Sequence, residues 1–181
     1  MVYRFLIVSD EVDDFMREIK INSNATFLEF HDAIREACGY EDGQKTSFTI
    51  CEDGWQKQEE ITLEDTQKDS DEDSYVMRST RLDEFLEDEK QHLIYTFDPL
   101  ADRVFFIELS EIITKKQLDA PVVSRSQGTP PQQFIDFDEL LAQNPINISD
   151  SSIDEDIDLY DDGIDEDIDL EGLDITEGEP F

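Results

Sequence analysis

Hydrophobic and polar residues follow a helical period in one stretch near the start of the chain. Between Asn22 and Tyr40, apolar residues recur every three or four positions, which is typical of an α-helix with one face against a core. Thr26 followed by Glu29 has the spacing of a capping box, and Gly39 offers a stop. The apolar stripe consists of Phe27, Phe30, His31, Ile34, Ala37 and Cys38. The pattern therefore predicts one short amphipathic helix at the centre of the fold.

Segments rich in β-branched and aromatic residues lie on both sides of this helix. Residues 3–9 and 15–21 predict an antiparallel hairpin, and residues 46–51 predict a third strand after the helix. Residues 91–97 and 103–109 predict a second hairpin across the turn that begins at Asp98 and Pro99, and their apolar content favours central strands. The predicted fold class is α+β, with a β-grasp-like mixed sheet packed on one main helix.

Weaker patterns complete the predicted fold. Trp55, Ile61 and Leu63 indicate a fourth strand, and the polar run from 64 to 74 indicates a surface loop. The spacing of Thr80 and Asp83 predicts a short second helix that includes Leu82, Phe85 and Leu86. Residues 134–143 indicate one or two amphipathic turns. The predicted organisation is a domain at 1–118, an extended and partly docked segment at 119–149, and a disordered acidic tail at 150–181.

The charge of the chain restricts its partners. The 181 residues include 48 acidic and 14 basic side chains, a formal net charge of -34. Residues 1–120 hold 30 acids and 13 bases, whereas residues 121–181 hold 18 acids and only Arg125, so each part carries -17. Such a charge repels phosphate backbones and anionic lipids. We therefore expect no direct nucleic-acid or membrane partner, and no apolar run approaches the length of a membrane span. A cytoplasmic location follows as the default expectation.

The last 32 residues contain an internal repeat, IDEDIDL, at 153–159 and again at 164–170. Residues 150–181 hold 15 acids and no Lys, Arg or His. Like charges, together with Gly163 and Gly172, oppose an isolated helix, so disorder is the expected free state. Regularly spaced aliphatic residues among acids are typical of segments that fold on a basic partner. The candidate partner-binding residues are Ile153, Ile157, Leu159, Ile164, Ile168 and Leu170.

Candidate chemistry is sparse. No nucleophile elbow, phosphate loop or dinucleotide-binding glycine pattern occurs, so we predict no cofactor and no enzyme activity. His31 and His92 are isolated from each other and from cysteine clusters, which favours structural roles over metal binding. The tail has alternating acids but lacks the glycine and glutamate spacing of a calcium loop. Cys38 lies on the apolar stripe and is expected to be buried and reduced.

Two aromatic residues and five scattered bases leave alternatives open. Trp55 and Tyr40 lie near predicted turns and suit either a binding patch or packing over the sheet edge. The bases do not cluster in sequence, which disfavours a basic patch without excluding one in the folded state. These bases are Arg17, Lys20, Arg78, Arg81 and Arg103.

Several of these segments together resemble a known family. The segments YRFLI, TFLEFHDAIREACGYEDG, SFTI and LIYTFDPLADRVFFIEL are similar to the plasmid pRiA4b ORF-3-like family, over roughly residues 2–113. The helix carries the most specific resemblance, with Phe30-His31 in place of a typical Leu-His pair and with Gly39-Tyr40 at its end. Residues 95–98 resemble the family's Tyr-x-Tyr-Asp element.

The chain also departs from the family pattern. Ala101-Asp102-Arg103-Val104 replaces the usual Gly-Asp-x-Trp, and Phe15-Met16-Arg17-Glu18 replaces a Trp-Arg-Arg sequence. Gly128-Thr129-Pro130-Pro131-Gln132 resembles a Gly and Pro-Pro-Glu-Asp stretch, with glutamines in place of acids. The resemblance implies an α+β fold, an association with plasmids and mobile elements, and no settled activity. On this interpretation the acidic repeats lie outside the family region.

Three functional hypotheses follow. The first is a non-enzymatic interaction module whose tail binds a basic protein partner, with a merely solubilising tail as its simpler version. The second is a regulator that mimics the negative charge of DNA. The third is an enzyme with a site around His31 or His92, which needs a concave pocket with perturbed titratable groups.

Overall fold

The computed structural model describes residues 1–65, 74–136, 138 and 142. The chain divides into two compact units, residues 1–135 and residues 136–181, and the elements named below lie in the first. In order these are β1 (Val2–Ser9), β2 (Met16–Asn22), α1 (Phe27–Cys38), β3 (Ser47–Glu52), η1 (Asp53–Trp55), β4 (Gln56–Thr62), β5 (Tyr75–Val76), η2 (Leu82–Glu84), β6 (His92–Asp98), β7 (Arg103–Ile113) and β8 (Val122–Gln127).

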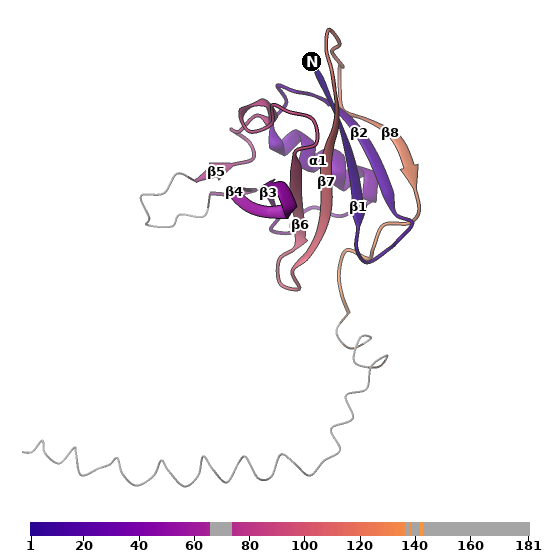
Figure 1. Cartoon of the computed structure of the whole chain (residues 1–181). Helices are drawn as coiled ribbons and strands as arrows, with labels where there is room; N and C mark the ends of the chain where they lie inside the picture. The colour runs from indigo at the N-terminus through magenta and orange to yellow at the C-terminus, as the bar shows by residue number, and fades with distance from the viewer. Residues whose placement is uncertain (66–73, 137, 139–141, 143–181) are drawn as a thin grey trace, which may run out of the picture. The chain divides into compact units, whose positions relative to one another are not determined.

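The strands form one mixed sheet of eight, in the order β5-β4-β3-β6-β7-β1-β2-β8 (Figure 1). All neighbours are antiparallel except β4 and β5, which pair in parallel through two residues. The two predicted hairpins, β1–β2 and β6–β7, are confirmed, and β6 and β7 lie in the interior of the sheet as predicted. The fold of the described part of the first unit is therefore α+β, with one α-helix and one mixed sheet.

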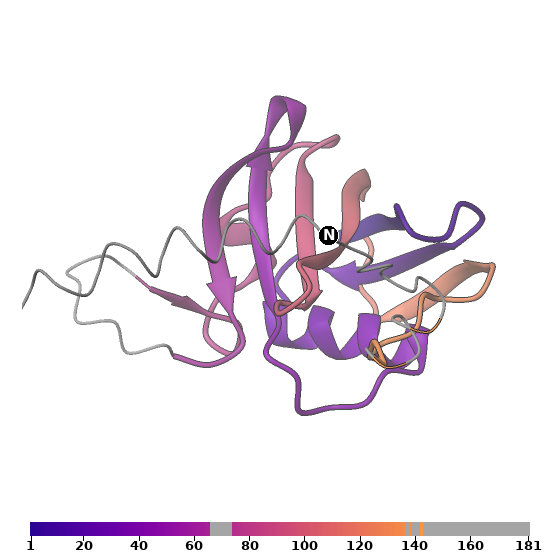
Figure 2. The same cartoon turned by 90° about the horizontal axis from the view of Figure 1, so that it is seen from below.

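Helix α1 packs on the concave face of this curved sheet, and no α-helix of the described residues covers the other face, called here the outer face (Figure 2). The capping box is confirmed, since the Thr26 hydroxyl accepts from Glu29 N at 3.2 Å and the Glu29 carboxylate accepts from Thr26 N at 2.7 Å. Gly39 ends the helix in a left-handed conformation, with φ of 69°. Stacked aromatic rings join the helix to the sheet, with Phe30 against both Phe5 and Phe48.

The period of two in β2 fixes which side chains face the helix. Phe15, Arg17, Ile19 and Ile21 alternate along this segment, and all four are buried. Burial of an arginine in this row requires hydrogen-bonding partners. Arg17 supplies them by donating to Ala37 O at the end of α1 and to Gln127 O in β8, so it ties helix, β2 and β8 together.

The predicted second helix is wrong in length and in its start. The Thr80 hydroxyl donates to Val76 O at 2.8 Å and therefore does not cap a helix. Residues Leu82–Glu84 form only one 3₁₀ turn, whose start is held by the Glu84 carboxylate, which accepts from Arg81 N at 3.1 Å. Leu82 and Leu86 are buried as the apolar pattern requires.

Strand β4 confirms the predicted fourth strand, but its ends differ from the predicted ones. Ile61 lies in the strand and is buried, whereas Trp55 belongs to the turn before it and Leu63 follows it. Five successive residues of β4 are exposed, so only the end of this strand contributes to the core.

Strand β8 lies in the segment 119–149 and pairs with β2. Asn22 holds the approach to it, donating to Leu118 O at 2.7 Å and accepting from Leu118 N at 2.8 Å. Gly128 holds its end, because a Cβ there would lie 2.6 Å from Asp14 O. The chain from 118 to 128 is thus fixed at both ends against β2 and the turn before it.

Several predictions fall on residues that the structure does not describe. These are most of the polar run between 64 and 74, much of the amphipathic segment 134–143, and the whole acidic tail with its repeats. Within the described residues, no helix has both the length and the apolar character needed to cross a membrane.

Candidate functional site

His31 lies in the core and not on a reactive surface. It is 3% exposed, and its Nδ1 lies 2.7 Å from the Tyr95 hydroxyl and 3.3 Å from the Thr46 hydroxyl. These contacts join α1 to β6 and to the residue before β3. The cavity beside them, under the loop from Glu41 to Gln44, has a volume of about 10 Å³, which is room for about one water molecule.

Burial shifts the pKa values of the titratable side chains in this cluster. Desolvation lowers the pKa of His31 below its ordinary value, and desolvation raises the pKa of Tyr95 far above its ordinary value. Both shifts favour the neutral forms, so the pair acts as a neutral hydrogen-bonded link in the core. Burial likewise raises the pKa of the Cys38 thiol to about 12, which leaves it unreactive.

A second polar cluster holds the chain segment that follows β8. The Arg103 guanidinium binds the Glu11 carboxylate through two hydrogen bonds of 2.8 and 2.9 Å, and it also donates to the backbone carbonyls of Gln132 and Gln133. The Tyr40 hydroxyl donates to Pro131 O. The aromatic residue Tyr40 is therefore a packing residue, in contact with Phe97 and Phe105, and it does not belong to a surface patch.

Trp55 lies on the outer face of the sheet with two aromatic neighbours. Its ring stacks on His92 with centroids 4.2 Å apart, and it meets Phe106 edge to face at 5.1 Å. His92 in turn contacts Glu108 at 3.4 Å, and Lys90 contacts the other oxygen of Glu108 at 3.3 Å. This cluster places a half-buried indole ring over the first residue of β6 and over Phe106 in β7.

Trp55 reaches this position through an uncommon backbone conformation. Gly54 and Trp55 both have positive φ, at 74° and 64°. A residue with a Cβ adopts this region at a cost of about 1–2 kcal/mol. The stacking on His92 and the edge contact with Phe106 offset part of that cost, and the turn points the ring across the sheet instead of away from it.

An open hollow of about 600 Å³ lies next to Trp55, and it is called here the acidic hollow. Five acids and a single lysine line it, together with His92. The acids are Glu52, Asp53, Glu59, Asp88 and Glu89, and the lysine is Lys90. None of the five acids forms an ion pair with any described residue, and Glu89 accepts a hydrogen bond from Ile112 N at 3.0 Å. The hollow therefore offers unpaired carboxylates beside an aromatic ring.

The five bases do not form a patch within the described residues. Arg17 and Arg103 are buried and committed to backbone carbonyls or to Glu11. Arg81 pairs with Asp83 at 2.9 Å. No three side chains of His, Cys, Asp or Glu among the described residues converge closely enough to hold a metal ion.

The tail residues proposed for partner binding, from Ile153 to Leu170, lie outside the described residues. Sequence reasoning considered Trp55 and His92 separately and missed their contact. The sequence did contain one indication of the sheet surface that Trp55 covers. A hairpin turn at 98–102 pairs His92 with Glu108 and Ile94 with Phe106, as observed. The approach of Trp55 to this row depends on the η1 turn; the Asp53-Gly54 pair predicted a turn there, but not the direction in which it carries the indole ring.

The fold and these surfaces define an α+β domain with a partly buried aromatic ring beside an acidic hollow. The chain belongs to the family described as Plasmid pRiA4b ORF-3-like protein, whose profile matches residues 3–167. The resemblance found in the sequence is thus confirmed, but its predicted extent is wrong. The match continues past residue 113 and includes the first acidic repeat and part of the second.

One similar solved structure is the crystal structure of a protein of unknown function from Methanosarcina mazei Go1. It matches with a TM-score of 0.58 and 19% sequence identity, covering 94% of this chain and 96% of that one. At this identity the likeness concerns the fold. A search of curated proteins found no match.

Proposed function

We propose that this chain is a non-enzymatic, cytoplasmic interaction module that binds a basic protein partner. The observation that supports the proposal most directly is the acidic hollow beside Trp55. A lysine or arginine side chain of a partner can pair with the unpaired carboxylates of the hollow. The same cation can lie over the indole ring, and such a cation–π contact contributes roughly 0.5–2 kcal/mol.

The acidic repeats at 153–159 and 164–170 supply a second attachment in this proposal. A disordered tail with aliphatic residues among acids can bind a basic groove of the same partner. Two linked contacts bind more tightly than either alone, because the second becomes intramolecular. In this proposal the first unit is a β-grasp-like domain that ends at residue 118. A partly docked segment at 119–149 then connects this domain to the acidic tail.

The single tryptophan of the chain provides a direct test. Titration with a lysine homopolymer should change the emission of Trp55, and the apparent affinity should fall as salt rises. The substitutions Glu59→Lys and Asp88→Lys should weaken binding, whereas Asp10→Lys, at an exposed position in the β1–β2 turn, makes the same charge change elsewhere. An equal loss for all three variants would show only a general charge effect, and an unchanged emission would remove the hollow from the proposal.

Affinity capture with the full chain and with a chain lacking residues 150–181 tests the role of the tail. The expected result is a basic protein retained by the full chain and lost, or more easily eluted by salt, without the tail. Identical capture by both chains would show that the tail only aids solubility.

Mimicry of DNA is the competing proposal, and it rests on the charge of -34. A mimic should displace DNA from DNA-binding proteins at moderate salt. Binding to basic proteins without displacement of DNA would favour the interaction module, and displacement from several unrelated DNA-binding proteins would favour the mimic.

A further inference from the structure

The β8 end of the sheet has an open strand edge. Strand β8 pairs with β2 on one side, and no described strand pairs with its other side. All six of its residues are exposed, including Val122 at 46% and Val123 at 43%. An edge strand of this kind presents backbone donors and acceptors that an extended peptide can use.

A groove runs between this strand and the helix, and it is called here the α1–β8 groove. It has a volume of about 410 Å³, and its apolar lining comes from Ala33 and Ala37 on the helix and from residues 120–123. In Figure 2 the sheet curves so that β8 comes down beside α1. A strand added to β8 would continue this curve, and every second side chain would point into the groove.

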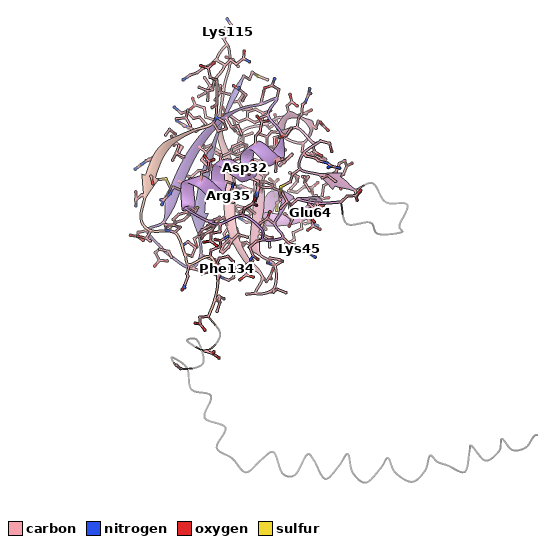
Figure 3. The ribbon with its side chains drawn as sticks, turned by 180° about the vertical axis from the view of Figure 1, so that it is seen from behind. Asp32, Arg35, Lys45, Glu64, Lys115 and Phe134 are labelled. Carbon is pink, nitrogen blue, oxygen red and sulfur yellow. The ribbon has the colours of Figure 1, made fainter. Side chains whose placement is uncertain are left out.

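The groove carries one sign of charge. Glu29, Asp32 and Glu36 line it at helical spacings of three and four, and no lysine or arginine lines it. Figure 3 shows the helix from this side, with Asp32 and Arg35 labelled. Arg35 reaches Asp32 only at 3.7 Å, a partly exposed contact that contributes little. Glu36 forms no ion pair with any described residue.

Strand β8 is held firmly enough to act as a template. Arg17 donates to Gln127 O at 2.8 Å from its place between β2 and α1. The Ser124 hydroxyl donates to the Glu18 carboxylate at 2.7 Å, and Asn22 holds Leu118 just before the strand. Binding therefore orders only the incoming peptide, which lowers the entropic cost of association.

We infer that the edge of β8 is a strand-addition site for an extended, basic segment of a partner protein, with lysine or arginine side chains directed at the acids of α1. This inference rests on the proposed function and specifies how the partner binds. The charge of the groove favours a basic segment. The acidic tail and a second copy of the chain are both strongly negative, so Glu29, Asp32 and Glu36 repel them.

Hydrogen exchange on the full chain tests the inference, with a short synthetic peptide of alternating lysine and valine as the probe. Outward-facing amides of Val122–Gln127 should exchange rapidly in the free protein and roughly tenfold or more slowly with the peptide bound. The double substitution Asp32→Lys with Glu36→Lys should abolish this protection. The matched control Asp10→Lys with Glu87→Lys, at two exposed acids away from the groove, makes the same change in charge and should retain it. A peptide of alternating glutamate and valine should give none.

The possible failures are distinguishable when Trp55 emission is recorded in the same titration. A change in Trp55 emission without protection of β8 overturns the strand-addition site and leaves the proposed function standing. No response of either reporter to the basic peptide overturns both. Protection of β8 that rises with protein concentration in the absence of peptide overturns the inference in favour of self-pairing.

Discussion

The two edges of the sheet are built differently, although both belong to the same sheet. Strand β4 carries three charged residues, Lys57, Glu59 and Glu60, and its last two residues are covered by β5. Strand β8 carries only Arg125, has two exposed valines, and has no described strand beyond it. Charges along an edge oppose pairing with another chain. One edge is therefore protected by its own side chains, whereas the other is open, and in our proposal the acids of the neighbouring helix decide which strand can pair with it.

The two sides of the sheet also differ in how they are joined to α1. On the β8 side the link is Arg17, which stays charged at any ordinary pH and donates to Ala37 O and Gln127 O. On the β3 side the link is His31, which contacts Thr46 and Tyr95 and loses its neutral form on protonation. Acid should therefore loosen the β3 side before the β8 side.

The largest expected effect concerns Arg103, which holds the chain after β8. Arg103→Met should lower the free energy of unfolding by about 3–5 kcal/mol, because Glu11 and Asp98 are left without their buried cation. Chemical denaturation measures this loss. Arg81→Met, which breaks an exposed pair with Asp83, should change stability by at most about 1 kcal/mol. Equal losses would mean that the segment after β8 is not anchored through Arg103.

Alanine substitutions at Gly128 and Gly54 allow the packing at the two edges to be compared, because both glycines have a similar positive φ. Gly128, after β8, has φ of 70° and no space for a Cβ, whereas Gly54, before β4, has φ of 74° and nothing within 4 Å. Gly54→Ala should cost about 1 kcal/mol, which is the backbone contribution alone. Gly128→Ala should cost about 2 kcal/mol or more, because the methyl group meets Asp14. Thermal or denaturant unfolding of both variants checks the difference, and equal costs would contradict close packing at Gly128.

The pH dependence of stability tests the histidine link. Burial lowers the pKa of His31 in the folded state, so the unfolded state binds the proton more readily. The stability that the neutral histidine provides is complete above its unfolded pKa of 6.5 and is lost as pH falls toward the lower folded value. The difference in unfolding free energy between wild type and His31→Gln should therefore shrink below that pH, by at most about 1.4 kcal/mol per pH unit. A difference that is constant or grows in acid would contradict a neutral buried His31.

The smallest expected change in stability comes from adding charge to the open edge. Val123→Lys should alter the unfolding free energy by about 0.5 kcal/mol or less, since the residue is exposed. The basic peptide should nevertheless no longer protect the amides of β8 from exchange, because the new ammonium group pairs with the acids of the groove. Gln58→Lys on β4 is the matched change at the other edge and should leave that protection intact. Protection lost equally in both variants would mean that net charge alone controls binding.

The sequence predicted the parts of the fold that depend on neighbouring residues. The capping box at Thr26, the stop at Gly39 and the two hairpins are local patterns, and each is present. The second helix was wrong because the Thr80 hydroxyl binds Val76 O, a competing local contact. Strand β8 was not recognised, because a strand exposed on both faces shows no alternation of polar and apolar residues.

Some features of the candidate surfaces likewise follow from the sequence, and others only from the tertiary structure. The acidic character of the chain, the stripe of α1 and the isolation of the two histidines are properties of the sequence alone. Only the tertiary structure decides that Trp55 lies on His92, that β8 takes the open edge, and that Asp32 and Glu36 line a groove beside it. The physical reason is range: periods and caps act over a few residues, whereas the free edge of a sheet depends on strand pairings between residues about a hundred positions apart, such as Arg17 with Ser126.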